Sequence, residues 1–313
     1  MQNRMWAPID EDEIPSSLYK YRTISVEHLQ ELQDDFSSFD IEGKVSNNPT
    51  FRKYISTMNH TLPESFPDAK SVVVMAVYTP LLKAYFHYKD VRHEVLVPHY
   101  YNDGITETHL IRTVKNQIIG KQGYRIENAK IHVLLKRLAV RSGLGKYGRN
   151  NLCFVEGMGS FVRLHAFFTD YRFAEDNWTE AMLMDRCANC KICLRNCPTG
   201  SISEKSFIVD VERCIPLYNE IPGEFPKWIE SASHSALMGC MRCQLPCPAN
   251  SSVIEKAQIL TEVAEEETES LIEESLNEEQ TALLSEKTRM FIPEEAWYYV
   301  PVLARNLRAL ITR

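Results

Sequence analysis

CANCKICLRNCP, at residues 187–198, spaces four cysteines as C-x2-C-x2-C-x3-C and follows the last one with a proline. Three thiolates at i, i+3 and i+6 on a tight loop can face three irons of one [4Fe–4S] cubane, whereas the fourth points toward a neighbouring cluster. A second set follows in GCMRCQLPCP at 239–248, and VERCIPLYNE at 211–220 supplies one more cysteine before it. The sequence therefore predicts two clusters, cluster one held by Cys187, Cys190, Cys193 and Cys247 and cluster two by Cys197, Cys214, Cys240 and Cys243.

Other uses of cysteine explain this spacing less well. A zinc ribbon would need two ligand pairs with a longer spacer and would have no use for a three-cysteine run that ends in Cys-Pro. Disulfides are rare in the cytosol, where thiols stay reduced. The ninth cysteine, Cys153, has no partner at a ligand spacing and lies in an apolar stretch, so we interpret it as a core residue rather than a functional thiol.

From the composition we expect a globular protein that stays in the cytoplasm. No run approaches the roughly 18 apolar residues that a membrane span needs, and the acidic N-terminus lacks the apolar stretch of a secretory signal. Net charge is −7, with 42 acidic and 35 basic residues, which disfavours wrapping a long stretch of nucleic acid as the main task. Local basic patches stay compatible with this balance.

Strands and helices alternate before the cysteines, which predicts a three-layer α/β domain over about 70–175. SVVVMAVYT at 71–79 is a near-continuous apolar, β-branched run, typical of a strand buried on both faces. A short helix is also expected near the N-terminus, over 25–36, with Ser25 as its cap. The other expected elements are helices over 108–123 and 130–143, each ending in glycine, and strands over 151–157 and 159–173.

Two segments after the cysteines are expected to be helical. The segment 255–286 holds eleven acidic residues and one lysine, with Ala, Leu and Ile at helical spacing, so we interpret it as a solvated helical face rather than an acidic recruitment tail. The last stretch, PVLARNLRALITR at 301–313, predicts a basic amphipathic helix that packs back on the body of the protein.

Glycines gather in RSGLGKYGRNN at 141–151, between a predicted helix and a predicted strand. Glycine lets backbone approach a flat or anionic cofactor closely. The G-x-G-x-x-G spacing of a dinucleotide fingerprint belongs after a strand and before a helix. Here the glycines follow a helix and precede a strand, so we reject a dinucleotide-binding site. An ordinary glycine turn and a cofactor-lining loop both remain open on spacing alone.

The order of the motifs resembles that of the cobalamin-dependent epoxyqueuosine reductases and, more distantly, the reductive dehalogenases. The matching stretches are FPDAKSVVVMAVYTP, LAVRSGLGKYGRNN, GSFVRLHAFFTDYRF, CANCKICLRNCPTGSI, ERCI and GCMRCQLPCPAN, which cover roughly 60–250. The resemblance implies a nitroreductase-like α/β domain followed by a ferredoxin-like module. The expected divisions are 1–60, a covering arm; 61–178, the cofactor domain; 179–250, the two-cluster module; and 251–313, a helical C-terminal segment.

The same resemblance implies the cofactor and its ligands. A base-off cobalamin is expected in the α/β domain with the clusters feeding its cobalt, and flavin is the less favoured alternative because nitroreductase-like domains hold either. Carried over by motif, the corrinoid-lining residues are Gly143, Gly145, Asn150, Gly159 and Ser160.

The general acid departs from the family pattern. The family places an aspartate in the stretch that here reads YRIENAKIHV, at 124–133, and Ala129 stands at its position. Glu127 is the nearest carboxylate, and Tyr101 and His132 are the other candidates, because a buried acid with a raised pKa can protonate an oxygen. The tyrosine motif of the family is represented by VPHYYNDG at 97–104.

The implied reaction is the two-electron reduction of an epoxide on a tRNA nucleoside to an alkene. Another oxygenated or halogenated small molecule is a second substrate class, since the C-terminal helical repeats of longer members, which help grip tRNA, are replaced here by an acidic segment. The competing hypothesis is a protein that passes electrons to a corrinoid or flavin on a partner. Either role needs a low-potential electron donor of the ferredoxin or flavodoxin type.

Overall fold

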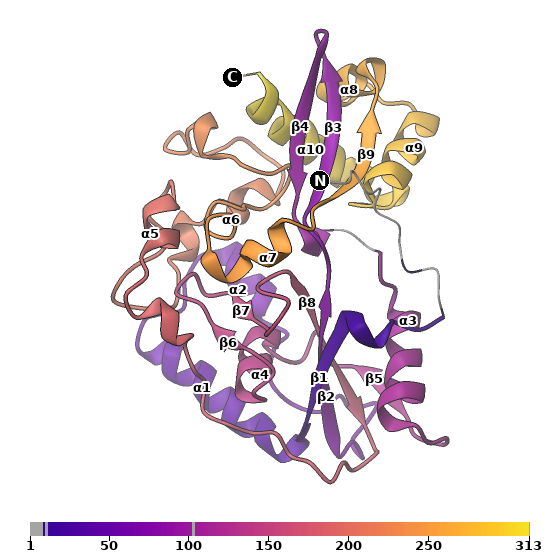
Figure 1. Cartoon of the computed structure of the whole chain (residues 1–313), viewed down its shortest axis with the longest axis vertical. Coiled ribbons are helices and arrows are strands. Elements are labelled where there is room, and N and C mark those ends of the chain that lie inside the picture. Colours follow the sequence, from indigo (N-terminus) through magenta and orange to yellow (C-terminus); the bar gives the residue numbers. More distant parts are fainter. Residues whose placement is uncertain (1–8, 10–11, 102–103, 313) are drawn as a thin grey trace.

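The computed structural model describes residue 9 and residues 12–101 and 104–312. Its first sheet has four antiparallel strands in the order β1-β2-β8-β5 (Figure 1). The strands are β1 (Tyr19–Ser25), β2 (Ser71–Tyr78), β5 (Ile126–Asn128) and β8 (Val162–Thr169). The first seven residues of β2 are buried, which confirms the central strand predicted from the apolar run SVVVMAVYT.

Helices cover both faces of this sheet and make three layers. On one face, Val72 and Val74 pack with residues of α1 (Leu29–Ile41) and α4 (Leu135–Arg141). On the other, Val73 and Met75 pack with α3 (Glu107–Thr113) and the π-helical η4 (Val114–Ile119), which ends at Gly120 with a left-handed φ of 64°. Alternating side chains of β2 thus pack into two separate apolar cores, one on each face of the sheet, which confirms the predicted fold class.

A second sheet stands apart from the first and was not predicted. Its order is β4-β3-β9, formed by β3 (Leu82–Tyr88), β4 (Val91–Val97) and β9 (Gln258–Val263), with β9 parallel to β3. Three helices complete this unit: α8 (Glu265–Ile272), α9 (Glu278–Thr288) and α10 (Ala296–Ile311) (Figure 1). Val302, Leu303 and Leu307 of α10 are fully buried, which confirms that the C-terminal helix packs on the body.

Two expectations for the flanking segments need correction. The N-terminal segment is more than a covering arm, because β1 pairs with β2 along its whole length. The acidic segment 255–286 is not wholly helical, since residues 258–263 form β9 and bury Leu260 and Val263 against β3. β1 and β9 are short strands, and each pairs with a strand far away in the sequence, so no local periodicity predicts them.

The cysteine-bearing segment folds with short helices only. These are α5 (Ile192–Asn196), α6 (Pro216–Asn219) and α7 (Ser251–Ile254). Another short helix, α2 (Pro49–Ile55), lies in the N-terminal segment. The predicted glycine loop forms a two-stranded ribbon of β6 (Lys146–Tyr147) and β7 (Cys153–Phe154). No helix within the described residues is long and apolar enough to cross a membrane.

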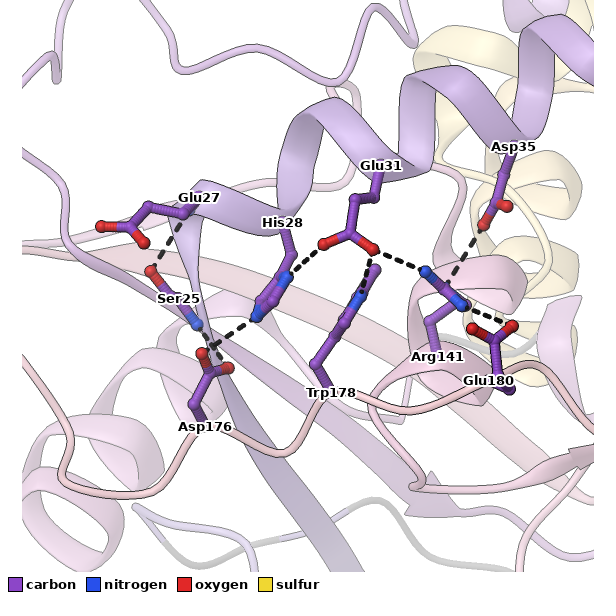
Figure 2. A network of polar contacts seen from close by, with 9 residues as sticks. All are labelled: Ser25, Glu27, His28, Glu31, Asp35, Arg141, Asp176, Trp178 and Glu180. Carbon is purple, nitrogen blue, oxygen red and sulfur yellow. Dashed lines mark hydrogen bonds and ion pairs between the residues drawn. The ribbon is translucent and has the colours of Figure 1, made fainter.

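A polar network fixes α1 to the segment that leads into the cysteine module (Figure 2). His28 contacts Glu31 at 2.6 Å and Asp176 at 2.9 Å, and its ring stacks on Trp178 with 4.5 Å between centroids. Glu31 also accepts hydrogen bonds from Trp178 Nε1 and from the buried guanidinium of Arg141, both at 2.9 Å. The connecting segment is therefore anchored on the α/β domain before the first cysteine is reached.

Candidate cluster-binding and active site

One pocket gathers the four cysteines assigned to cluster one. Cys187, Cys190, Cys193 and Cys247 all line it, and each is a free thiol. Arg149 also lines it and donates hydrogen bonds to the carbonyl oxygens of Cys187 at 2.6 Å and Cys190 at 3.3 Å. The guanidinium thus shapes the cysteine loop and places a positive charge beside the site, where it would favour the more negative, reduced state of a cluster.

The four cysteines assigned to cluster two also lie together. Burial raises the pKa of Cys214 to about 12, and the neighbouring thiols of Cys240 and Cys197 raise it further. Burial likewise raises the pKa of Cys243 well above the ordinary thiol value, with Cys240 and Cys214 adding to the shift. Four enclosed thiols that influence one another suit a cluster, which binds thiolates and releases their protons.

Asn150 lies between the two cysteine sets. Its side chain is 7% exposed and lines the cluster-one pocket, while its amide opposes the burial that raises the pKa of Cys243 in the second set. Neither amide atom has a hydrogen-bond partner in the described structure. A buried amide with open donors and acceptors, placed between two thiol sets, is suited to hydrogen-bond cluster sulfur.

A tyrosine pair and a half-buried carboxyl lie beside cluster two. The Tyr101 hydroxyl donates a short hydrogen bond to Glu220, and the rings of Tyr100 and Tyr101 lie 4.5 Å apart. Gly239, next to Cys240, packs directly against these rings, since a Cβ at this position would lie 2.6 Å from the Tyr101 ring. Tyr101 is therefore brought beside a cluster ligand.

Burial shifts both groups toward their protonated forms. It raises the pKa of Glu220 and raises that of Tyr101 well above its ordinary value. For Tyr100 burial is again the main cause, followed by Glu220 and the thiols of cluster two. Glu220 was missed from the sequence, although it ends the VERCIPLYNE stretch that carries Cys214, because nothing local marks it as buried.

Lys136 brings a positive charge to the same place. Its ammonium donates hydrogen bonds to the backbone oxygen of Asn151 at 3.1 Å and to the side-chain oxygen at 3.0 Å. Surrounding protein lowers the pKa of Lys136, and the thiols of Cys214, Cys153 and Cys243 oppose that shift. This lysine, also missed from the sequence, can balance the negative charge of a cluster.

The other two predicted acids lie elsewhere. Glu127 is on the edge strand β5, where it accepts a hydrogen bond from Ser65 at 2.8 Å and pairs with Arg125 at 2.7 Å. His132 is half-buried, with its ring 6.0 Å from that of Phe168. The described contacts of these two side chains include no cluster cysteine.

Three of the residues expected to line a corrinoid contact protein on the side where a Cβ would point. A Cβ on Gly145 would lie 2.6 Å from the Cys153 sulfur, and one on Gly143 would lie 3.5 Å from Thr179. Gly159 has a left-handed φ of 59°, and a Cβ there would lie 2.3 Å from the Asn250 side chain. Of the five expected residues, Asn150 alone keeps side-chain polar atoms without a partner.

Gly159 and Ser160 contact Gln244 and Asn250 of the cysteine module, and we call this contact the joint. The Ser160 backbone N–H donates to Asn250 Oδ1 at 2.9 Å, and its hydroxyl donates to Gln244 at 3.0 Å. Asn250 Nδ2 donates in turn to the Ser160 hydroxyl at 2.9 Å and to the Gln244 backbone oxygen at 3.0 Å. The Gly-Ser turn therefore fastens the α/β domain to the cysteine module just after Cys247.

Unpartnered polar atoms gather around Phe161, the residue after this joint. They are the Tyr78 hydroxyl, the Thr79 hydroxyl and His99 Nδ1. Thr79 N–H donates to the Phe161 carbonyl at 3.1 Å, and the His99 and Phe161 ring centroids are 5.0 Å apart. Burial lowers the pKa of His99 to about 3, so its imidazole is neutral. Such donors and acceptors fit a cofactor rimmed with polar groups, as a corrinoid is with amides.

Comparison with known proteins agrees with this site. The family model described as a 4Fe-4S double cluster binding domain matches residues 186–250. The cysteine geometry and this match define a two-cluster iron–sulfur protein.

The resemblance to epoxyqueuosine reductases is confirmed in sequence and in fold. The chain is 33% identical over 135 residues to the epoxyqueuosine reductase of Vibrio cholerae, covering 43% of this chain and 35% of that protein. It is 34% identical over 119 residues to the one of Escherichia coli, covering 38% and 30%. The alignments span about a third of these relatives.

Solved structures match over most of the chain. The epoxyqueuosine reductase from Streptococcus thermophilus superposes with a TM-score of 0.62 at 16% identity, covering 94% of this chain and 77% of that one. An epoxyqueuosine reductase with a tRNA-Tyr epoxyqueuosine-modified stem loop gives 0.63 at 20% identity, covering 93% and 76%. The fold is thus that of epoxyqueuosine reductases, which are oxidoreductases by name.

Proposed function

We propose that this protein is a two-cluster reductase of the epoxyqueuosine reductase type, in which electrons pass from cluster one to cluster two and then to a polar site. The observation that carries the proposal is the hydrogen-bonded Tyr101–Glu220 pair beside the cluster-two cysteines. A terminal cluster next to stored protons can support a reduction that consumes both electrons and protons.

The burial of the two cysteine sets supports this direction of flow. Burial raises the pKa of Cys214 to about 12 and that of Cys243 well above its ordinary value, whereas the rises at the cluster-one thiols Cys193 and Cys247 are smaller, so cluster two lies deeper in the protein. The first set lies on a loop with exposed neighbours, among them Arg186 and Asn189. Electrons would therefore enter at cluster one, near the surface, and leave from cluster two, near the tyrosine pair.

The protons come from the chain's own side chains. Reduction of an epoxide to an alkene takes up two electrons and two protons and releases water. Burial raises the pKa of Glu220, which favours its protonated form, the hydrogen bond from Tyr101 opposes that rise, and the same bond holds Tyr101 at the carboxyl. The pair can deliver one proton and be recharged from solvent, while the Lys136 ammonium stabilises negative charge that develops nearby.

A corrinoid is the proposed acceptor of the electrons, held by Tyr78, Thr79 and His99, whose polar atoms lack partners. It would supply the two-electron chemistry of its cobalt. Epoxyqueuosine in tRNA is the proposed substrate, because the similar proteins carry that name and one of them is described with such a stem loop. The close packing of Gly145 and Gly159 against protein favours the second candidate, an electron carrier for a partner's corrinoid or flavin.

Two measurements on the anaerobically reconstituted protein separate these functions. We expect added cobalamin to shift its absorption spectrum on binding. We also expect the gene to remove epoxyqueuosine from the tRNA of a strain that lacks its own reductase, as read by nucleoside mass spectrometry. Binding without loss of epoxyqueuosine would reject the tRNA substrate. Absence of cobalamin binding would reject the corrinoid and favour the carrier.

Replacing Glu220 by Gln is expected to lower turnover about 100-fold, because an amide keeps the hydrogen bond to Tyr101 but cannot give up a proton. Iron content and cluster spectra should not change. In the unchanged protein, activity should fall as pH rises through the raised pKa of Glu220, and this pH dependence should vanish in the variant. Glu127→Gln is the matched control, expected to be active; an inactive control with an active Glu220→Gln would move the acid to Glu127.

A further inference from the structure

The loop that carries cluster one presents a distinctive surface to solvent. We define the cluster-one face by six exposed residues: Met182, Leu183, Arg186, Asn189, Lys191 and Arg195. Figure 1 shows α5 and its loop at the outer edge of the molecule, on the side away from α3. The face thus lies directly over the cysteines through which we propose that electrons enter.

Its charge is opposite to that of the whole chain. Arg186 and Arg195 have no ion-pair partner among the described residues, whereas Asp185, the exposed carboxylate on this loop, pairs with Lys146 at 3.8 Å. Lys191 pairs with Glu204 at 2.6 Å, which lowers the pKa of that carboxyl. The guanidinium of Arg149 adds a further charge beneath the loop, bound to carbonyl oxygens rather than to a carboxylate. A locally positive face on a chain of net charge −7 selects for an acidic partner.

An apolar centre completes the face. Met182 is 47% exposed and Leu183 is 44% exposed, just before the first cysteine. Both are held in place by backbone hydrogen bonds, since Tyr147 N–H donates to the Met182 carbonyl at 2.8 Å and Met184 N–H donates to the Tyr147 carbonyl at 2.9 Å. Exposed apolar side chains on a fixed backbone, beside positive charges, are typical of the core and rim of a transient interface.

Arg186 links this face to the cluster itself. It lines the cluster-one pocket together with Cys187 and Cys247. A partner bound over Arg186 would therefore bring its own redox centre close to cluster one. Electron transfer requires such an approach, because its rate falls steeply with distance.

We propose that the cluster-one face docks a small acidic one-electron carrier protein of the ferredoxin type. The reduced carrier gives up one electron and is oxidised, and cluster one passes from the 2+ to the 1+ state; two such events supply one catalytic reduction. The inference rests on the proposed function only in taking cluster one as the point where electrons enter. It requires neither a corrinoid nor a substrate.

The test is the rate at which a photoreduced acidic ferredoxin bleaches the cluster absorbance of the reconstituted protein, without substrate or cobalamin. Arg195→Glu should lower the second-order rate constant about tenfold at low salt and abolish its decrease with ionic strength. Arg195→Lys should restore the rate. Lys115→Glu, an equal charge change on η4 next to α3, should leave it unchanged, and reduction by cationic methyl viologen should not fall in any variant.

An Arg195→Glu protein that reacts as fast as the unchanged protein, with the same salt dependence, would overturn the proposal. Equal losses in Arg195→Glu and Lys115→Glu would also overturn it, because they would show a general charge effect. If Arg195→Glu also slowed reduction by methyl viologen, the change would act on the cluster itself rather than on docking. Leu183→Ser would then test the proposal, because it alters the face without altering its charge. It must slow reduction by ferredoxin and leave reduction by methyl viologen unchanged. Loss of docking with retained methyl viologen-driven turnover leaves the reductase proposal intact.

Discussion

Replacing Cys214 by Ala should reduce bound iron from about eight to about four atoms per chain, because one of two [4Fe–4S] clusters loses a ligand. Cys214 is the informative choice, since it lies outside both C-x2-C runs and reaches cluster two only through the fold. The structure brings its enclosed thiol next to Cys240 and Cys197. Iron analysis and electron paramagnetic resonance of the reduced protein measure the loss, and turnover should fall below detection.

The ligand sets can be separated by pairing such variants. Cys197→Ala should remove the same resonance signal as Cys214→Ala, whereas Cys247→Ala should remove the other one, although Cys197 follows the first run and Cys247 the second. Cys153→Ala is the control: this thiol is 4% exposed in the apolar core and should leave the iron content unchanged. Full iron content in Cys214→Ala, or equal signals in Cys197→Ala and Cys247→Ala, would contradict the cross-over assignment.

Replacing Gly159 by Ala should destabilise the protein by about 3 kcal/mol, the sum of a left-handed backbone strain and an overpacked contact. The φ of Gly159 is 59°, and its Cβ would lie 2.3 Å from Asn250 Oδ1 and 3.1 Å from the Ala249 carbonyl oxygen. The anaerobic melting temperature of the reconstituted protein should fall by roughly 5 °C. Cluster content should fall too, because the joint lies next to Cys247.

Gly157 provides a matched control two residues away. Its φ is 76°, yet nothing lies within 4 Å of a Cβ there, so Gly157→Ala should cost only the backbone strain, about 1 kcal/mol. Asn250→Ala removes the atom that clashes, so combining it with Gly159→Ala should cost less than the sum of the two single changes. Equal destabilisation by Gly157→Ala and Gly159→Ala would show that packing at the joint is not the cause.

Features that depend on local spacing were predictable from the sequence. Cluster cysteines must repeat at short intervals to reach one cubane, so their grouping follows from the spacing alone. The buried strand β2 and the amphipathic α10 were likewise marked by composition and period. By contrast, the parallel pairing of Lys83 with Ile259 joins two unremarkable stretches, and the pairing alone makes them a sheet.

The candidate acid was only partly predictable for the same reason. Tyr101 was proposed from its motif, but Glu220 becomes an acid only because folding buries it against the tyrosine. Glu127 lies near the right place in the sequence, yet Arg125, two residues before it, neutralises its charge. Two of the glycines expected to line a corrinoid, Gly145 and Gly159, also pack closely against protein on their Cβ side, which no local pattern predicted.

The second sheet sets the order in which this chain can be completed. β3 and β4 leave the ribosome before the cysteine module, whereas β9, their parallel neighbour, emerges after it. Parallel pairing across so long an interval is slow, because the intervening segment must first become compact. We therefore expect iron loading and closure of this sheet to be coupled during biogenesis. A newly made chain starved of iron would then keep the edge of β3 exposed, and quality-control proteases would recognise it before any loss of catalysis could be seen.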